Sequence, residues 1–256
     1  MKTKVTSEVA NSPILALNFL LRKLFHFVIH PLVRDFSEIG DLFVSGSELL
    51  SHLMNNEVSD IYLKTLTTEF ESVQRDFFKF NGKGASRSMI GGQSRFVLFS
   101  LVRILKPNHV LETGVDNGVS SYFILRALES NRSGRLSSTD VSPDCGSLLG
   151  GIDRGIWDLH LLKGPSKRRD FTSYLRDQQF DVFIHDSNHS YTWQLFEYES
   201  VLKHMNSDSL ILSDDVDSSY AFIDFSKSHS LRPSFLFDKT KFFGGVQVNQ
   251  TGRDMI

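Results

Sequence analysis

From Pro107 to the C-terminus, short apolar runs alternate with stretches of helical periodicity, and this alternation limits the fold more than any other feature of the sequence. The runs that precede segments long enough for a crossover helix are His109–Glu112, Arg135–Thr139, Asp158–Leu162, Phe180–His185 and Leu210–Ser213. Strands separated by helices favour crossover units and a parallel sheet. The most apolar runs, Phe180–Ile184 and Leu210–Leu212, are predicted to be central strands covered on both faces.

The last two predicted strands are connected differently. Ser234–Asp238 and Gly244–Val248 lie too close together for a crossover helix, so they are expected to form an antiparallel pair. The sequence therefore predicts a doubly wound α/β fold of the Rossmann-like type, with a mostly parallel, seven-stranded sheet and an antiparallel C-terminal pair.

The first part of the chain has a different periodicity. Up to about residue 106, apolar residues recur at spacings of three and four, as in Ile61–Lys79 and Gln93–Leu105, and no strong strand signal appears there. We therefore predict a helical N-terminal cap or lid over residues 1–90, which is also a candidate oligomerisation segment. Residues 91–256 are predicted to form the main, ligand-binding domain.

Composition limits the partners. The chain has 256 residues, of which 40% are hydrophobic and 23% charged, enough for one large α/β domain with an additional helical part. The net charge is −2 with both signs mixed, so no nucleic-acid partner is expected and a small molecule is the default ligand. The single cysteine, Cys145, excludes an internal disulfide and favours a reducing, cytoplasmic location.

An apolar segment, Ile14–Ile29, is predicted to form a helix that begins near Ser12 and ends before Pro31. Charged residues such as Arg22 and Lys23 interrupt it, so stable insertion into a membrane is not expected. Its apolar surface must be covered, either by the main domain or by a second subunit in a homodimer; attachment to a membrane surface is the alternative.

A glycine-containing turn follows the first predicted strand. Gly114-x-x-x-Gly118 precedes a predicted helix, Tyr122–Glu129, and glycines at such a turn let the backbone approach a ligand closely. The turn is not the dinucleotide fingerprint, because Asp116 stands where the second glycine would fall. The alternative is that these glycines serve only the steric needs of the turn.

The second predicted strand ends in Asp140, a position from which a carboxylate can accept hydrogen bonds from ribose hydroxyls. The alternative is a helix cap, since Pro143 would suit a first helical turn. The third strand leads into Gly164-Pro165-Ser166, a turn that could hold the edge of an adenine.

These motifs, in this order, resemble class I S-adenosylmethionine-dependent methyltransferases. The matching segments are Glu112-x-Gly114-x-x-x-Gly118-x-Ser120, Asp140-x-x-Pro143-Asp144-Cys145, Gly164-x-Ser166, Phe183-Ile184-His185-Asp186 and Leu212-Ser213-Asp214-Asp215-Val216. More narrowly, they are similar to metal-dependent O-methyltransferases of the catechol type and of the type that acts on sugar hydroxyls of natural products. The resemblance implies that the methyl donor is bound by Glu112, Gly114, Asn117, Gly118, Ser120, Ser121, Asp140, Gly164 and Ser166.

Three aspartates follow neighbouring strands of the predicted sheet. Asp186 ends the fourth strand, and Asp214 and Asp215 end the fifth, so all three are expected at the edge where α/β sheets bind ligands. Clustered carboxylates repel one another unless a cation lies among them, and oxygen ligands suit Mg²⁺ or Mn²⁺. We therefore predict a magnesium site, with manganese able to substitute. The alternative is that Asp214 and Asp215 cap the predicted helix Ser219–Lys227.

His189 follows Asp186 by three residues and is the candidate general base, with Asp186 as the second catalytic residue. The resemblance supports this role, because the matching residue is lysine in the catechol enzymes and typically histidine in the sugar-hydroxyl enzymes. The alternative is a surface histidine at a helix start.

The sequence thus predicts an S-adenosylmethionine- and metal-dependent O-methyltransferase acting on a hydroxyl of a small, sugar-like or natural-product acceptor. The alternatives are a methyltransferase-fold binding subunit without turnover, or a protein with different chemistry such as the cephem-modifying proteins. A catalyst requires Asp186, His189, Asp214 and Asp215 to converge beside the donor pocket, whereas a binding subunit does not.

Overall fold

The computed structural model describes residues 17, 20–21, 39–81, 90–150, 152–239 and 241–248. The predicted helix over residues 14–29 lies almost entirely outside these residues, so its packing and any homodimer it supports stay predictions. Among the described residues, no helix combines the length and apolar character needed to cross a bilayer.

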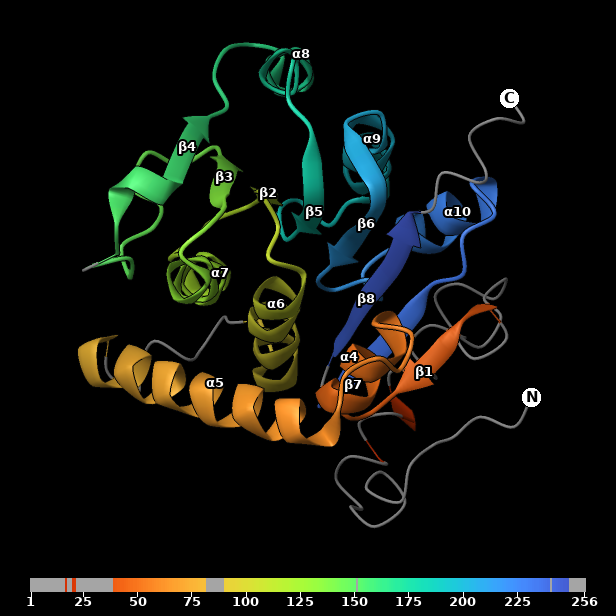
Figure 1. The fold of residues 1–256 in the computed structure, drawn as a ribbon. Coiled ribbons are helices and arrows are strands. Elements are labelled where there is room, and N and C mark those ends of the chain that lie inside the picture. The colour runs from red at the N-terminus through yellow and green to blue at the C-terminus, as the bar shows by residue number, and fades with distance from the viewer. Residues whose placement is uncertain are drawn as a thin grey trace.

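The described residues form one eight-stranded sheet with the strand order β1-β7-β8-β6-β5-β2-β3-β4 (Figure 1). The strands are β1 Asp41–Phe43, β2 His109–Thr113, β3 Arg135–Asp140, β4 Trp157–Leu161, β5 Phe180–His185, β6 Met205–Ser213, β7 Ser234–Asp238 and β8 Lys241–Val248. Strand β8 runs antiparallel to both β6 and β7, and the other neighbouring pairs are parallel. The predicted α/β class and the antiparallel C-terminal pair are confirmed.

The predicted number of strands was wrong by one. Strand β1 pairs in parallel with β7 and forms an additional edge of the sheet. It has three residues, and only Leu42 in its centre is buried. So short a run has too few alternating positions to give a strand signal.

Helices cover both faces of the sheet (Figure 1). One face packs against α4 Gly46–Leu53, α5 Asp60–Asn81, α6 Gly92–Leu105 and α7 Val119–Asn131, and the other against α8 Lys167–Tyr174, α9 Tyr191–Leu202 and α10 Ala221–Ser228. A short 3-10 helix, η2 Arg154–Ile156, precedes β4. Side chains alternate between the two cores as strand geometry requires: Val182 and Ile184 of β5 enter the first, and Phe183 the second.

The described part of the N-terminal region packs directly on the main domain. Leu50 of α4 and Leu66 of α5 have no exposed surface and belong to the same core as α6 and α7. The ring of Phe70 lies 5.5 Å from that of Phe96 and 5.4 Å from that of Phe123. Helices α4 and α5 therefore share one core with the sheet, whereas the predicted boundary at residue 90 stays a prediction.

The winding of the chain changes direction between β2 and β5, which are neighbours in the sheet. Helix α7 after β2 covers one face, and α9 after β5 covers the other. Such a switch point leaves a crevice at the carboxyl ends of the strands. The hydrogen-bond ladder continues past these ends, because Asp186 N donates to Thr113 O (2.9 Å) and Asp214 N donates to His185 O (2.9 Å).

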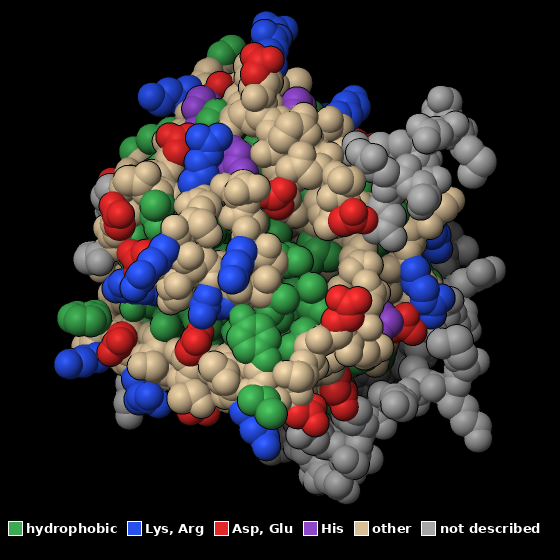
Figure 2. All heavy atoms as spheres, in the orientation of Figure 1, with side chains coloured by type: hydrophobic (Ala, Val, Ile, Leu, Met, Phe, Trp, Pro, Cys, Tyr) green, Lys and Arg blue, Asp and Glu red, His purple; other side chains and the backbone are tan. Residues whose placement is uncertain are grey.

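The surface has a mixed charge. On the face shown in Figure 2, Lys, Arg, Asp and Glu side chains are scattered around an apolar area, and neither sign dominates.

Candidate active site

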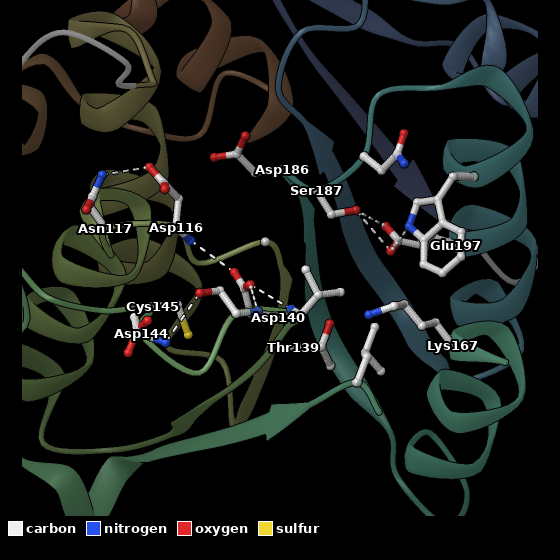
Figure 3. A pocket seen from close by; sticks show the side chains of 16 residues that line it. Asp116, Asn117, Thr139, Asp140, Asp144, Cys145, Lys167, Asp186, Ser187 and Glu197 are labelled. Carbon is white, nitrogen blue, oxygen red and sulfur yellow. Dashed lines mark hydrogen bonds between the residues drawn. The ribbon is translucent and has the colours of Figure 1, made fainter. Parts of the chain in front are cut away.

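A cavity of about 650 Å³ lies at the switch point. It is lined by Gly114, Asp116, Asn117, Thr139, Asp140, Val141, Ser142, Asp144, Cys145, Leu162, Lys167, Asp186, Ser187, Asn188, Trp193 and Glu197. In Figure 3, Asp116 and Asn117 lie on one side, Ser187 and Glu197 on the other, and Asp140 between them. Of the predicted donor-binding residues, Gly114, Asn117 and Asp140 line this cavity.

The glycine turn brings the backbone close to β5. Gly114 has a φ of +83°, and a Cβ at this position would lie 2.1 Å from the carbonyl oxygen of Asp186. Gly118 has a φ of +92° and precedes α7, and a Cβ there would lie 2.7 Å from Leu149 Cγ. Both positions require glycine for conformation and for space. Both glycines meet steric needs of the turn, and Gly114 in addition borders the cavity, so its role in binding the donor stays a prediction.

Asp140 organises the turns around the cavity. Its Oδ2 accepts from the amides of Val115 (2.7 Å) and Asp116 (3.0 Å), and its Oδ1 from those of Val141 (2.6 Å) and Ser142 (2.8 Å). Residues 141–150 form turns and bends rather than a helix, so the helix-cap alternative was wrong. A carboxylate has about four acceptor positions, so hydrogen bonds from ribose hydroxyls would have to share or replace these amides.

Glu112, Ser120 and Ser121 lie beneath the glycine turn and do not line the cavity. Glu112 is fully buried and accepts hydrogen bonds from the hydroxyls of Ser120 (2.6 Å), Ser121 (2.6 Å) and Ser138 (2.8 Å). Burial raises the pKa of Glu112 above its ordinary value, and the serine hydroxyls oppose this shift. In this structure the cluster ties β2, β3 and the start of α7 together.

Gly164 and Ser166 are exposed and lie outside the cavity lining. The Ser166 hydroxyl accepts from Arg169 N (3.3 Å), so it caps the start of α8. Their neighbours Leu162 and Lys167 line the cavity instead. Lys167 is the first residue of α8 and is exposed at the border of the cavity.

The four residues predicted to perform the chemistry converge. His189 Nε2 lies 4.0 Å from Asp186 Oδ1 and 3.8 Å from Asp215 Oδ2. Asp214 is buried beside Asp215, whereas Asp186 lines the cavity. Helix α10 begins after Tyr220 without a side-chain cap, so the proposed capping role of Asp214 and Asp215 was wrong.

The electrostatics of this cluster are strongly perturbed. Burial and the nearby Asp214 raise the pKa of Asp186 well above its ordinary value, and burial raises the pKa of Asp214 to about 6. Burial and the neighbouring His185 ring lower the pKa of His189, so its neutral form, which can accept a proton, is favoured at neutral pH.

Lys241 lies within the carboxylate cluster, although no sequence motif pointed to it. Its Nζ donates to Asp214 Oδ2 and lies 3.6 Å from Asp215 Oδ1. Burial lowers the pKa of Lys241, but the two carboxylates outweigh this effect and raise it, so the ammonium stays charged. In the described part of the chain, no group of three acidic, histidine or cysteine side chains is arranged to hold one ion. The residues as arranged do not fit the octahedral oxygen shell that Mg²⁺ requires.

Glu197 of α9 is a second residue that sequence reasoning missed. It is buried at the cavity wall and accepts from Thr113 Oγ1 (2.7 Å), Trp193 Nε1 (2.6 Å) and the Ser187 hydroxyl (3.0 Å). Its Oε2 also lies 2.6 Å from His185 Nδ1. The sequence could have indicated this residue only by its spacing, because Glu197 shares the buried face of α9 with Gln194 and Tyr198.

Comparisons with known proteins agree with this fold. Residues 111–216 match the family described as a methyltransferase domain. An O-methyltransferase from Bacillus cereus, solved in complex with SAH, aligns with a TM-score of 0.52 and 16% identity, over 78% of this chain and 96% of its own. The O-methyltransferase TomG from Streptomyces achromogenes, involved in tomaymycin synthesis and solved with SAM, aligns with a TM-score of 0.53 and 16% identity, over 74% and 95%. No curated protein matches the sequence.

The strand order and the glycine turn at the switch point resemble those of class I S-adenosylmethionine-dependent methyltransferases, and residues 111–216 match a methyltransferase domain. Within that class, the solved structures described above, which this chain resembles in fold, are O-methyltransferases. The resemblance expected from the sequence motifs is confirmed.

Proposed function

We propose that the protein transfers a methyl group from S-adenosylmethionine to a hydroxyl of a small, sugar-like or natural-product acceptor. The observation that carries the proposal is the juxtaposition of Gly114 and Asp186: the glycine turn and the acidic tip of β5 meet at one cavity, with His189 beside them. Proteins of similar fold were solved with SAH and with SAM, which supports this choice of donor.

The cavity suits a nucleoside with an attached charged group. Val141, Leu162 and Trp193 supply apolar surface against which a flat purine could pack. Asp116 and Asp144 supply acceptors for hydroxyl groups. A side chain on residue 114 would collide with the backbone of Asp186, so glycine lets the turn approach the end of β5 closely at the edge of the cavity. When bound, S-adenosylmethionine supplies the activated methyl group.

His189 is assigned as the general base of the proposed reaction. Its Nε2 faces Asp186 and Asp215, and its Nδ1 is buried without a hydrogen-bond partner among the described residues. The side chain of His189 is 29% exposed, so the Nε2 side of the neutral imidazole, rather than the buried Nδ1, can accept the proton of the acceptor hydroxyl. The proton leaves as the new oxygen–methyl bond forms and the methyl–sulfur bond of the donor breaks. Holding the acceptor at reacting distance from the donor would account for most of the rate.

The convergence of His189 with the three aspartates favours a catalyst over a binding subunit, which would not need it. The magnesium or manganese ion predicted from the clustered carboxylates is not part of the proposed mechanism, because Lys241 already supplies positive charge between Asp214 and Asp215.

The proposal is tested with methyl-labelled S-adenosylmethionine and a panel of sugar and phenol acceptors. We expect calorimetric binding of the donor and transfer of label to at least one acceptor hydroxyl. Binding of the donor without transfer to any acceptor would support the binding-subunit alternative, and absence of donor binding would refute the proposal.

A further inference from the structure

Lys241 is held in the carboxylate cluster by the register of the sheet rather than by a flexible surface loop. Strand β8 pairs with β6 so that Gly244 lies opposite Ser213, the last residue of β6. Lys241 therefore begins β8 three residues before that pair and extends beyond the tip of β6, where Asp214 lies.

One backbone–backbone and one backbone–side-chain hydrogen bond hold the same two segments together. Val216 N donates to Phe242 O (3.0 Å), and Phe242 N donates to Asp217 Oδ1 (3.2 Å). The side chain of Lys241 is only 16% exposed and that of Asp214 only 2%. A buried lysine needs an anionic partner, and here both Asp214 and Asp215 provide one.

We propose that Lys241 takes the place of the divalent ion used by the metal-dependent O-methyltransferases that the sequence resembles. Its ammonium group supplies the positive charge among Asp186, Asp214 and Asp215, and the wild-type chain binds no divalent cation there. The assignment of positive charge to Lys241 does not rest on the proposed function. Only the consequence of this charge for catalysis rests on it.

The proposal predicts that removal of the ammonium creates a metal site. In Lys241→Met, the carboxylate oxygens of Asp214 and Asp215 lose their cation, and Asp214 Oδ1 already has no hydrogen-bond partner among the described residues. Three carboxylates without a compensating charge are the type of oxygen site that Mn²⁺ and Mg²⁺ occupy.

The test is a titration of the full chain with Mn²⁺, in which free Mn²⁺ is followed by its electron paramagnetic resonance signal. We expect Lys241→Met to bind one Mn²⁺ at least ~10-fold more tightly than the wild type. The gain should disappear in the double variant Lys241→Met/Asp214→Asn. Lys241→Arg, which keeps a cation, and Lys227→Met, which removes an exposed lysine on α10, should both resemble the wild type.

If Lys241→Met does not fold, thermal unfolding of the wild type in Mn²⁺ still tests the proposal. Its thermal midpoint should not rise in millimolar Mn²⁺, because a ligand stabilises only the state to which it binds. A rise that Asp214→Asn abolishes, or wild-type affinity for Mn²⁺ equal to that of Lys241→Met, would overturn the proposal and mean that the lysine moves aside for a metal. Calorimetric binding of S-adenosylmethionine, measured in parallel, tests the proposed function separately.

Discussion

At Gly114, the turn that follows β2 packs directly against the backbone of Asp186 at the end of β5. Because this glycine has a positive φ and faces the carbonyl of Asp186, Gly114→Ala combines a left-handed backbone cost of ~1–2 kcal/mol with an overpacking cost of ~1–3 kcal/mol. We expect a lower free energy of unfolding and weaker donor binding, measured by urea denaturation and calorimetry. Gly150→Ala is the matched control, since no atom lies within 4 Å of the Cβ that it would add. Equal effects of the two substitutions would contradict this interpretation.

A substitution of His189 tests the proposed reaction separately from the fold. If His189 accepts the acceptor proton, His189→Asn should lower kcat for methyl transfer by ~10²–10⁴-fold, while the Kd for S-adenosylmethionine stays unchanged. His229→Asn is a suitable control, because His229 pairs with Glu199 (3.0 Å) rather than with the aspartates near His189. Unchanged kcat in His189→Asn would show that another group removes the proton.

Some residues of the site could be predicted from the sequence and others could not. Asp186 and Asp214 each follow a parallel strand, and the carboxyl ends of neighbouring parallel strands meet, so their convergence follows from position in the chain. Lys241 reaches the same place from an antiparallel strand, and its position depends on where the connection between β7 and β8 turns. The four amides that surround Asp140 depend on loop conformation, which residue spacing does not determine.

At the scale of elements, long periodic segments were predictable and short ones were not. Helix α5 was expected over Ile61–Lys79 and spans Asp60–Asn81, because its apolar positions recur over several turns. Strand β1 has three residues, and it is a strand because β7 offers it an edge rather than because of its own sequence. Tertiary context decides such short elements.

A substitution in helix α4 tests whether the N-terminal region is a separate cap or part of the main core. Leu50 is fully buried against α6 and the sheet, so Leu50→Ala should cost ~2–5 kcal/mol and preserve a single unfolding transition. Glu57→Ala, at an exposed position just beyond the helix, should have little effect on the free energy of unfolding. Urea denaturation followed by circular dichroism measures both, and two separate transitions would mean that residues 46–81 unfold independently.

At the scale of the whole molecule, the sheet places structural and functional groups at opposite ends of its strands. The carboxyl ends carry the glycine turn and the acidic cluster, which is where a doubly wound topology leaves a crevice. The amino ends are fixed by polar contacts such as the one between Asp181 Oδ2 and the amide of Asn108 (2.7 Å). Ligand binding and sheet assembly therefore depend on different residues, and substitutions at the amino ends should change stability without changing the site.

His109, at the amino end of β2, couples the stability of the whole fold to pH. Its Nε2 lies 2.7 Å from Ser137 Oγ and its Nδ1 lies 3.1 Å from Gln179 O, and burial lowers its pKa to about 4. In the unfolded chain the histidine has its ordinary pKa of ~6.5. Between pH ~6.5 and about pH 4 the unfolded state therefore binds a proton at His109 and the folded state does not, so the free energy of unfolding falls as the pH decreases through this range. Between pH 7 and pH 5 the wild type should lose roughly 1–2 kcal/mol more than His109→Gln, which has no titrating group there. Urea denaturation at the two pH values measures the difference, and equal losses would mean that the buried ring is protonated in the folded protein.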